Sequence, residues 1–289
     1  MQKTLFPRVR PRRLRLNETI RDLVSETNIN KSKLVQPLFV SDTLKKKEEI
    51  VTMPGQYLYS KDDILSEIDE LADLGINTIA LFPNIESSLK DISGSEALKE
   101  DNFICSIVRQ IKERFPELVI ITDVALDPYT SSGHDGIILD GKIDNDLTLE
   151  ALSKMSVNLA SSGADILAPS DMMDGRIGKI RDSLEKNNHK DIILLSYAAK
   201  YASNFYSPFR DAVGSKQTEG ISKRTYQMDS KNLKEAYKEI LLDINEGADI
   251  LMVKPAMPYL DVINDLSQKT NVPIFAYQVS GEYSMLKMG

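Results

Sequence analysis

The sequence predicts an α/β fold of the TIM (β/α)8-barrel type, and three observations support this prediction. Short apolar runs alternate with helical patterns along 289 residues, a length that suits a barrel. The same junction between a helix and the next apolar run recurs along the chain. No Gly-x-Gly-x-x-Gly motif follows the first apolar run, which disfavours the alternative of a doubly wound sheet that binds dinucleotides.

A basic stretch precedes the alternating pattern. Residues 1–17 carry six basic side chains and two prolines, and a segment of this composition cannot pack a core of its own. A disordered tail and a nucleic-acid patch are two alternatives. Because the whole chain has a formal net charge of −7, we expect no nucleic-acid partner and favour an arm that embraces a neighbouring subunit. The arm would cover residues 1–30 and the barrel domain residues 31–289.

Seven apolar runs are the candidate strands of the barrel. They are almost continuously apolar, as expected for parallel strands that are buried on both faces. The runs are residues 35–40, 78–83, 119–125, 165–170, 192–196, 250–254 and 273–278. An eighth βα unit is not found before the sequence stops at Gly289. We therefore expect a barrel that is incomplete at its C-terminal side.

The helices between these runs are predicted from their periodicity and their ends. Residues 61–74 and 231–246 each place apolar side chains on one helical stripe. Gly75, Gly163 and Gly247 follow three of the helical patterns and stand just before the next strand. A glycine at this place is expected to end the helix with a positive φ, which costs glycine little.

Composition also limits the setting of the protein. No apolar run approaches the length of a membrane span, and the N-terminus lacks the apolar core of a signal peptide. Cys105 is the only cysteine, so the chain forms no intramolecular disulfide and no cysteine cluster for a metal. We expect a cytoplasmic protein without a membrane partner.

Polar side chains at the ends of the predicted strands are the candidate catalytic groups, because barrel enzymes carry their active sites there. Lys200 and Lys254 end neighbouring strands in the apolar contexts SYAAKYA and LMVKPA. Desolvation and mutual repulsion lower the pKa of an amine, and only a neutral amine attacks a carbonyl to form a Schiff base. The alternative is that a lysine here anchors a phosphate or a carboxylate.

A resemblance to a known family is carried by five motifs, which read YAAKYASNFYSPFRDAVGS, APSDMMDGRIG, YQMD, MVKPAMPYLD and YQVSGEY. Together they resemble porphobilinogen synthase, also called 5-aminolevulinate dehydratase, and the resemblance runs from the basic arm to Gly289. It implies a TIM barrel with an N-terminal arm, usually assembled into homo-octamers. The implied activity is that of a hydro-lyase, which condenses two molecules of 5-aminolevulinate into porphobilinogen in tetrapyrrole (haem and chlorophyll) biosynthesis.

The same resemblance implies roles for the catalytic residues. Lys254 would form the Schiff base with the substrate that becomes the propionate side of the product. Lys200 would form the second Schiff base, on the acetate side. Asp123 and Ser170 would support the two lysines through hydrogen bonds, and a carboxylate at this place can shuttle protons. For Asp123, a purely structural hydrogen-bond acceptor is the alternative.

Residues that hold the substrate carboxylates are implied in the same way. Arg210 and Lys223 match the positions that bind the acetate-side carboxylate, with Gln227 close by. The family pattern has an arginine where this sequence has Lys223, so the charge is kept without bidentate geometry. Ser280 matches a serine that binds the propionate-side carboxylate. A tyrosine of the eighth strand, which shares this task in the family, has no match here.

The metal expectation depends on the loop DVALDPYTSSGHDG. In zinc-dependent members this loop carries three cysteines, whereas the matching positions here are Ala125, Asp127 and Asp135. We therefore expect no catalytic zinc, and the two carboxylates would at most suit magnesium or a monovalent cation. His134, without a second histidine nearby, is not expected to be a ligand. Separately, the resemblance implies an allosteric, activating magnesium site at Glu239.

One loop and two alternative functions complete the expectations. Residues 215–224, SKQTEGISKR, are polar and lack periodicity, which predicts a mobile lid that excludes water from the imines. A class I Schiff-base aldolase is one alternative, but it would use a single imine lysine. The other alternative is a catalytically silent barrel subunit with a structural role, which the missing eighth unit favours.

Overall fold

The structure of the protein is a computed structural model, and it describes residues 8–215 and 220–289. The chain divides into two compact units, Met1–Leu34 and Val35–Gly289. In the described part of the first unit, α1 (Glu18–Leu23) begins at Asn17, whose side chain accepts a hydrogen bond from the Ile20 amide. None of the residues in its helical elements is buried, so this described part has no core.

The second unit is organised around a mostly parallel sheet with the strand order β11-β10-β9-β8-β5-β4-β1-β3-β2. Only β2 pairs with its neighbour in the antiparallel direction. The strands of this sheet are β1 (Gln36–Ser41), β2 (Glu48–Glu49), β3 (Tyr57–Tyr59), β4 (Thr78–Asn84), β5 (Val119–Val124), β8 (Ile166–Pro169), β9 (Ile193–Lys200), β10 (Ile250–Lys254) and β11 (Ile274–Ala276). A separate antiparallel ribbon consists of β6 (Ile138–Leu139) and β7 (Lys142–Ile143). All seven predicted strands are thus confirmed, and β9 continues past its predicted end to Lys200.

The α/β class and the mostly parallel sheet are confirmed, but a sheet of the TIM-barrel type is not, because the sheet does not close in the described part of the chain. Among the described residues β11 pairs only with β10, and the far side of β1 pairs with β3. The sheet is therefore open, and its two edge strands are β11 and β2. Both edge strands are short, since β11 contains three residues and β2 contains two.

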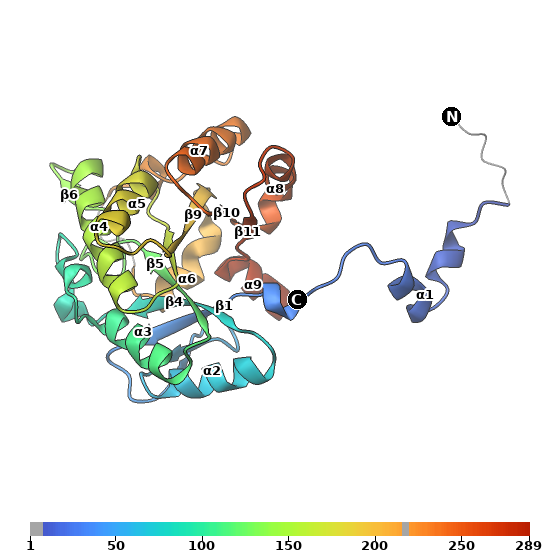
Figure 1. The fold of residues 1–289 in the computed structure, drawn as a ribbon, viewed down its shortest axis with the longest axis horizontal. Coiled ribbons are helices and arrows are strands. Elements are labelled where there is room, and N and C mark those ends of the chain that lie inside the picture. The colour runs from blue at the N-terminus through green and yellow to red at the C-terminus, as the bar shows by residue number, and fades with distance from the viewer. Residues whose placement is uncertain (1–7, 216–219) are drawn as a thin grey trace. The chain divides into compact units, whose positions relative to one another are not determined.

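Helices surround the sheet on its outer side, as Figure 1 shows for α2, α3, α4, α5, α7 and α8. Their bounds, with those of two further helices, are α2 (Asp63–Asp73), α3 (Phe103–Arg114), α4 (Asn145–Ser161), α5 (Arg176–Lys186), α6 (Ser207–Ala212), α7 (Leu233–Asn245), α8 (Leu260–Ser267) and α9 (Ser280–Met288). The expected stripe of α2 is buried, with Ile64, Ile68 and Leu71 at most 5% exposed. Neighbouring residues of the strands contribute alternately to two cores. Leu38 and Val40 pack in the cluster that includes helical side chains, whereas Phe39 packs in the other cluster.

The junctions between helices and strands have the predicted backbone conformation. Gly75, Gly163 and Gly247 have φ values of 80°, 104° and 101°, which only glycine adopts at little cost. Two aspartates that follow these glycines also tie the strand ends together. Asp165 accepts a hydrogen bond from the Ile120 amide, and Asp249 accepts one from the Leu194 amide.

Helix α7 buries only part of its predicted apolar stripe, in which Ile240 is 1% exposed. Leu233, Tyr237 and Leu241 are more than one-third exposed, while Asp243 is only 2% exposed. The reason is a buried ion cluster, in which the Arg176 guanidinium lies 3.4 Å from Asp243 Oδ2. Removing one partner from such a cluster typically costs about 3–5 kcal/mol, because the other charge is left buried without compensation.

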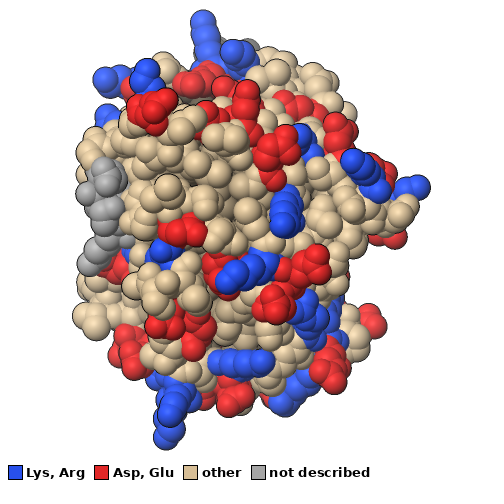
Figure 2. Space-filling view, turned by 90° about the vertical axis from the view of Figure 1, so that its left-hand side faces the viewer, with Lys and Arg blue, Asp and Glu red and all other residues tan. Residues whose placement is uncertain are grey.

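No helix within residues 8–215 and 220–289 is both long and apolar enough to cross a lipid bilayer. Figure 2 shows one face of the molecule, on which basic and acidic side chains are interspersed. A nucleic-acid footprint would instead gather basic side chains into one patch or stripe.

Candidate active site

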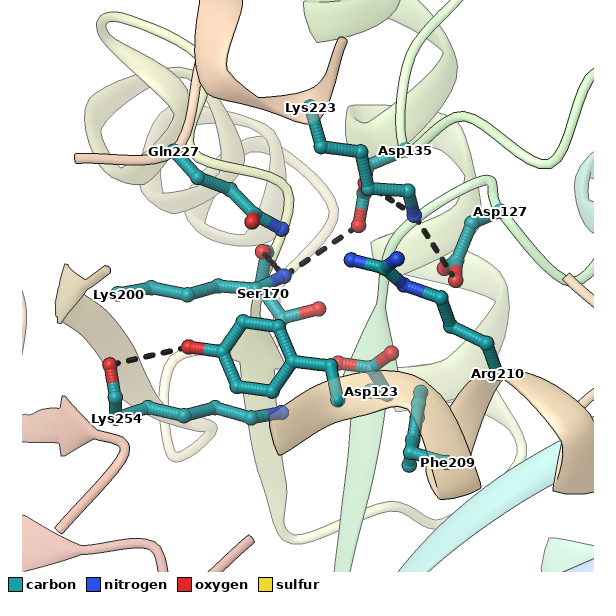
Figure 3. A pocket seen from close by; sticks show the side chains of 11 residues that line it. Asp123, Asp127, Asp135, Ser170, Lys200, Phe209, Arg210, Lys223, Gln227 and Lys254 are labelled. Atoms are coloured by element: carbon teal, nitrogen blue, oxygen red, sulfur yellow. Dashed lines mark hydrogen bonds and ion pairs between the residues drawn. The ribbon is translucent and has the colours of Figure 1, made fainter. Parts of the chain in front are cut away.

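Nine of the predicted site residues line one pocket at the carboxyl ends of the strands (Figure 3). The lining residues are Asp123, Asp127, Asp135, Ser170, Lys200, Tyr206, Phe209, Arg210, Lys223, Gln227 and Lys254. The space left free between these side chains is about 20 Å³, which is room for roughly one water molecule. A substrate can enter only if some of these side chains move apart.

The two candidate lysines lie side by side because their strands hold them in register. Lys200 is the last residue of β9, Lys254 is the last residue of β10, and the two are paired across the parallel strands. Each is only 5% exposed. In Figure 3 both side chains extend into the pocket in the same direction. The sequence pattern of two apolar runs that each end in a lysine is thereby explained.

Lys254 has an aromatic environment. Its Nζ lies 4.4 Å from the centre of the Tyr277 ring, and Tyr197, Tyr206 and Phe209 present their rings at 5.0–5.3 Å. Among the described residues, Nζ has no hydrogen-bond or ion-pair partner. Burial, with a further contribution from the positive charge of Lys200, lowers the pKa of Lys254 to about 7. A large fraction of this amine is therefore neutral, and nucleophilic, near neutral pH.

Lys200 has polar neighbours instead. Its Nζ donates a hydrogen bond to the Ser170 carbonyl oxygen and lies 3.4 Å from Asp135 Oδ1. The partner at position 170 is thus the backbone carbonyl. The two lysines consequently differ in character, since one is enclosed by rings and the other is paired with a carboxylate.

Asp123 lies at the end of β5 and faces both lysines across the pocket. Burial, reinforced by the negative charge of Asp127, raises its pKa to about 7, although Lys200 and Lys254 act in the opposite direction. Its Oδ1 has no hydrogen-bond partner among the described residues. A carboxyl group that titrates near neutral pH beside an amine that does the same is suited to transfer protons between reaction intermediates.

Asp135 is the centre of the charged half of the pocket. Its Oδ2 lies 2.9 Å from Lys223 Nζ, and the same ammonium lies 3.6 Å from Asp127 Oδ2. Burial alone would raise the pKa of Asp135, but the charges of Lys200 and Lys223 hold it well below its usual range. Asp135 is therefore a carboxylate. Burial alone would lower the pKa of Lys223, but Asp135 and Asp127 raise it, so Lys223 is an ammonium.

The donor set of this loop does not fit zinc. Ala125 offers no ligand atom, and the two carboxylates at positions 127 and 135 already share the Lys223 ammonium. Within the described residues no three side chains of the His, Cys, Asp or Glu type are placed to hold a metal ion together. His134 points its Nδ1 to the Tyr226 hydroxyl at 3.0 Å.

Two predicted site residues lie outside the pocket lining. The Ser280 hydroxyl donates to the Phe205 carbonyl oxygen and accepts from the Phe209 amide, both at 3.0 Å, so it anchors the segment before and within α6. Glu239 lines a second, larger cavity of about 660 Å³. Residues 216–219 of the predicted lid lie outside the described residues. Gly214, the residue just before the predicted lid, accepts a hydrogen bond at its carbonyl oxygen from Lys90 Nζ at 2.9 Å.

Several contributors to the pocket were not predicted. The aromatic residues around Lys254 come from three places in the chain, and only the crowding of aromatics in YAAKYASNFYSPF hints at them. The Tyr206 hydroxyl donates to the Tyr201 carbonyl oxygen at 2.6 Å and also lies 3.2 Å from the Lys254 carbonyl oxygen, so it is placed between the ends of β9 and β10. Tyr226, within the YQMD motif, donates to Asp135 Oδ2 at 2.7 Å. Its position in a loop gave no periodic signal.

Two enclosed lysines in register on a parallel sheet, beside an arginine and a further lysine, define the site of an enzyme that forms Schiff bases with acidic substrates. Comparison with known proteins identifies the family. Residues 8–289 match the family model of delta-aminolevulinic acid dehydratase. The chain belongs to this family, the porphobilinogen synthases, whose reaction is the condensation of two 5-aminolevulinate molecules into porphobilinogen.

Individual relatives agree with this assignment. The chain is 50% identical to the delta-aminolevulinic acid dehydratase of Bradyrhizobium diazoefficiens, over 96% of this chain and 79% of that protein. It is also 50% identical to the enzyme of Methanothermus sociabilis, over 98% of this chain and 87% of that protein. The crystal structure of the Toxoplasma gondii enzyme, in complex with porphobilinogen, superposes with a TM-score of 0.94 at 46% identity. That match covers 97% of this chain and 80% of the other.

Proposed function

We propose that this chain condenses two molecules of 5-aminolevulinate into porphobilinogen through Schiff bases on Lys254 and Lys200. The observation that carries the proposal is the pair of amines at paired positions of β9 and β10. Each substrate offers a ketone to an amine and a carboxylate to a cation. Lys200 and Lys254 provide one amine for each of two ketones, and Arg210 and Lys223 provide cations for a substrate carboxylate. An aldolase of the Schiff-base type needs only one imine lysine.

The reaction balances with the groups that the pocket contains. The neutral amine of each lysine attacks a substrate ketone, and each imine forms with the loss of one water. Both lysine amines are released when the product ring closes, so two substrates give one product and two waters. Asp123 accepts and returns the protons that these steps move, and the Ser170 carbonyl oxygen keeps the Lys200 amine oriented.

Substrate binding exchanges one carboxylate for another. In the closed pocket the Lys223 ammonium is bound to Asp135 and Asp127. We propose that the acetate-side substrate brings its own carboxylate to Lys223 and Arg210, with Gln227 beside them, and so opens the space that it occupies. Ser280 remains our candidate for the propionate side, and its hydroxyl would have to turn away from the Phe205 carbonyl oxygen.

Borohydride trapping tests the proposed function. The chain is incubated with 5-aminolevulinate, reduced, digested and mapped by mass spectrometry, so that adducts on the two lysines are distinguished. Adducts on both Lys254 and Lys200, together with formation of porphobilinogen, are expected. An adduct on one lysine alone would favour an aldolase-like reaction. A chain that forms no adduct at all would be the catalytically silent subunit.

We also propose that Glu239 holds an allosteric magnesium ion. Glu239 lies half-buried in the 660 Å³ cavity, which Asp174, Asp229 and Glu235 also line. Burial raises the pKa of Glu239, the charge of Arg176 opposes this, and the nearby acidic residues Asp243, Asp174 and Glu235 raise it further. Several acidic side chains gathered around one carboxylate would attract and stabilise a bound cation. Magnesium commonly keeps several waters and takes one or two protein carboxylates, so a dense ligand cluster is not required.

Replacing Glu239 by glutamine is expected to remove the response to magnesium. The ratio of the rates of porphobilinogen formation with and without magnesium should fall to about one, because the neutral amide no longer attracts the hydrated ion. Glu150→Gln, a change at an exposed glutamate that pairs with Lys179, is the matched control. A Glu239→Gln variant that magnesium still stimulates like the unchanged chain would refute the assignment.

The remaining expectations concern assembly. We propose a cytoplasmic homo-octamer with a TIM-barrel domain of residues 31–289, in which residues 1–30 contact a neighbouring subunit. The arm carries Leu16, Leu23 and Ile29, which are 72%, 82% and 89% exposed, and such apolar side chains are usually covered. A chain without residues 1–30 should sediment as a smaller species than the full chain. Equal sedimentation of both would contradict the role of the arm.

A further inference from the structure

Asp135 is shared between two lysines, and Tyr226 is the residue that holds it between them. One carboxylate oxygen, Oδ1, lies 3.4 Å from Lys200 Nζ, and the other, Oδ2, lies 2.9 Å from Lys223 Nζ. The Tyr226 hydroxyl donates to Oδ2 at 2.7 Å and also accepts from the Asp135 amide at 3.4 Å. The same hydroxyl therefore contacts both the side chain and the backbone of Asp135.

We propose that Tyr226 is a positioning residue for the Schiff base at Lys200, because its hydroxyl fixes the Asp135 carboxylate in the orientation that serves Lys200 and Lys223 together. This inference rests on the proposed imine at Lys200. Asp135 does not react in it. Its carboxylate provides the negative charge next to the nitrogen that becomes the cationic, protonated imine, and Tyr226 acts through that carboxylate.

The local fold explains why Tyr226 and Lys223 reach the same carboxylate. Lys223–Thr225 forms one 3₁₀ turn, and the Tyr226 amide donates to the Lys223 carbonyl oxygen at 3.2 Å. Side chains three residues apart in such a turn lie on the same side. The turn is also attached to the end of β9, since the Met228 amide donates to the Lys200 carbonyl oxygen at 3.0 Å and the Ala202 amide donates to the Met228 carbonyl oxygen at 2.9 Å. Tyr226 and Lys200 thus keep a fixed separation.

His134 completes the support of the hydroxyl. The hydroxyl of Tyr226 has a single proton, and the carboxylate of Asp135 is its shorter and charged acceptor. The hydroxyl oxygen then accepts from His134 Nδ1–H at 3.0 Å, which assigns the proton of the neutral imidazole to Nδ1. Burial and the charge of Lys223 lower the pKa of His134, which favours this neutral form. His134, which the sequence excluded as a metal ligand, acquires a role as the second support.

The carboxylate would be shared differently without the hydroxyl. Lys223 is the closer of the two lysines. The contacts that oppose rotation of the carboxylate toward Lys223 are the short hydrogen bond from the Tyr226 hydroxyl and the longer contact with Lys200 itself. Lys200 would then keep only the Ser170 carbonyl oxygen as a described hydrogen-bond partner. Lys254 lies among aromatic rings, has no described contact with Tyr226, and is influenced by Asp135 only as a minor charge contribution, so its reactivity should change little.

The test compares trapping at the two lysines in the full chain. Tyr226→Phe removes the hydroxyl and keeps the ring. We expect the borohydride-trapped adduct with 5-aminolevulinate to form roughly 10- to 100-fold more slowly on Lys200, as for loss of a hydrogen bond to a charged group, and at an unchanged rate on Lys254. Tyr201→Phe is the matched control, because the Tyr201 hydroxyl donates to the Asn232 carbonyl oxygen at 3.3 Å, away from Asp135. It should leave both rates within about twofold of those of the unchanged chain.

A double-mutant cycle distinguishes positioning from general loss of structure. Asp135→Asn removes the charge that Tyr226 holds. If Tyr226 acts through Asp135, adding Tyr226→Phe to Asp135→Asn should slow the Lys200 adduct by less than about twofold, whereas independent effects would multiply. A full further loss in the double variant would overturn the proposal, as would equal slowing on Lys200 and Lys254.

Thermal melting shows whether each variant is folded. If Tyr226→Phe does not fold, His134→Leu serves as the second variant, because it removes Nδ1 and leaves the tyrosine in place. The expected result is a smaller, severalfold slowing that is confined to Lys200. Unchanged trapping on Lys200 in either folded variant would refute the positioning role. Absence of adducts in the unchanged chain would instead refute the proposed function itself, and this inference with it.

Discussion

Replacing Lys254 by alanine is expected to slow the formation of porphobilinogen by at least about 10⁴-fold, because the variant lacks the nucleophile that forms the propionate-side imine. Lys200 does not take its place, because Lys200 forms the imine with the second substrate. The fold should persist, because Nζ of Lys254 makes no described hydrogen bond that the rest of the structure depends on. Initial rates and the mapped adducts are the measurements.

The control for this variant is Lys179→Ala, which removes a partly exposed lysine that pairs with Glu150. It should retain the rate of the unchanged chain, since exposed ion pairs contribute little. The adduct on the Lys254 peptide must vanish in Lys254→Ala. Turnover within tenfold of that of the unchanged chain would mean that the imine forms elsewhere, and the proposed mechanism would be wrong.

Much of the fold follows from local patterns that the sequence contains. Six of the seven predicted strands are largely buried and, like β11, are almost continuously apolar, which makes them visible without knowledge of their partners. The positive φ of Gly163 and Gly247 is set by the helix end itself. Closure of the sheet is different, because it depends on whether the edge strands β11 and β2 find partners, and no local pattern encodes that.

The active site also contains residues that local sequence patterns predict and residues that only the folded chain brings together. Lys200 and Lys254 are conspicuous because each ends an apolar strand, and parallel pairing of β9 with β10 then brings them together. The partners of these lysines are harder to predict. Asp135 and Tyr226 are 91 positions apart and meet only in the folded chain. Asp243 looks like one more acid on an exposed helix until Arg176 is placed against it.

The two lysines are not equivalent, although the resemblance assigns them the same chemistry. Aromatic rings surround the Lys254 amine, so its cationic form lacks a described carboxylate partner and its pKa is lowered to about 7. The Lys200 amine has such a partner in Asp135. Substitutions of charged neighbours should therefore change the pKa of Lys254. Removing a positive charge should raise that pKa, and removing a negative charge should lower it.

The second large effect is expected from the groups that set the pKa of Lys254. The rate of trapping at Lys254 should rise with pH through about 7, because the fraction of neutral amine increases as pH passes the pKa. Lys200→Met should abolish turnover, since the acetate-side imine is lost. It should also move the midpoint of Lys254 trapping to higher pH, because the positive charge of Lys200 lowers the pKa of Lys254 and the methionine does not.

Asp123→Asn is expected to move the same midpoint in the opposite direction. The negative charge of Asp123 raises the pKa of Lys254, so its removal lets the pKa fall and the neutral amine appear at lower pH. Each shift should be on the order of one pH unit, and Lys179→Met should cause none. Midpoints that move in the same direction, or that stay fixed in both variants, would show that burial alone sets the reactivity of Lys254. Opposite shifts would show that Lys200 and Asp123 tune the amine by charge, independently of any role that either plays in turnover.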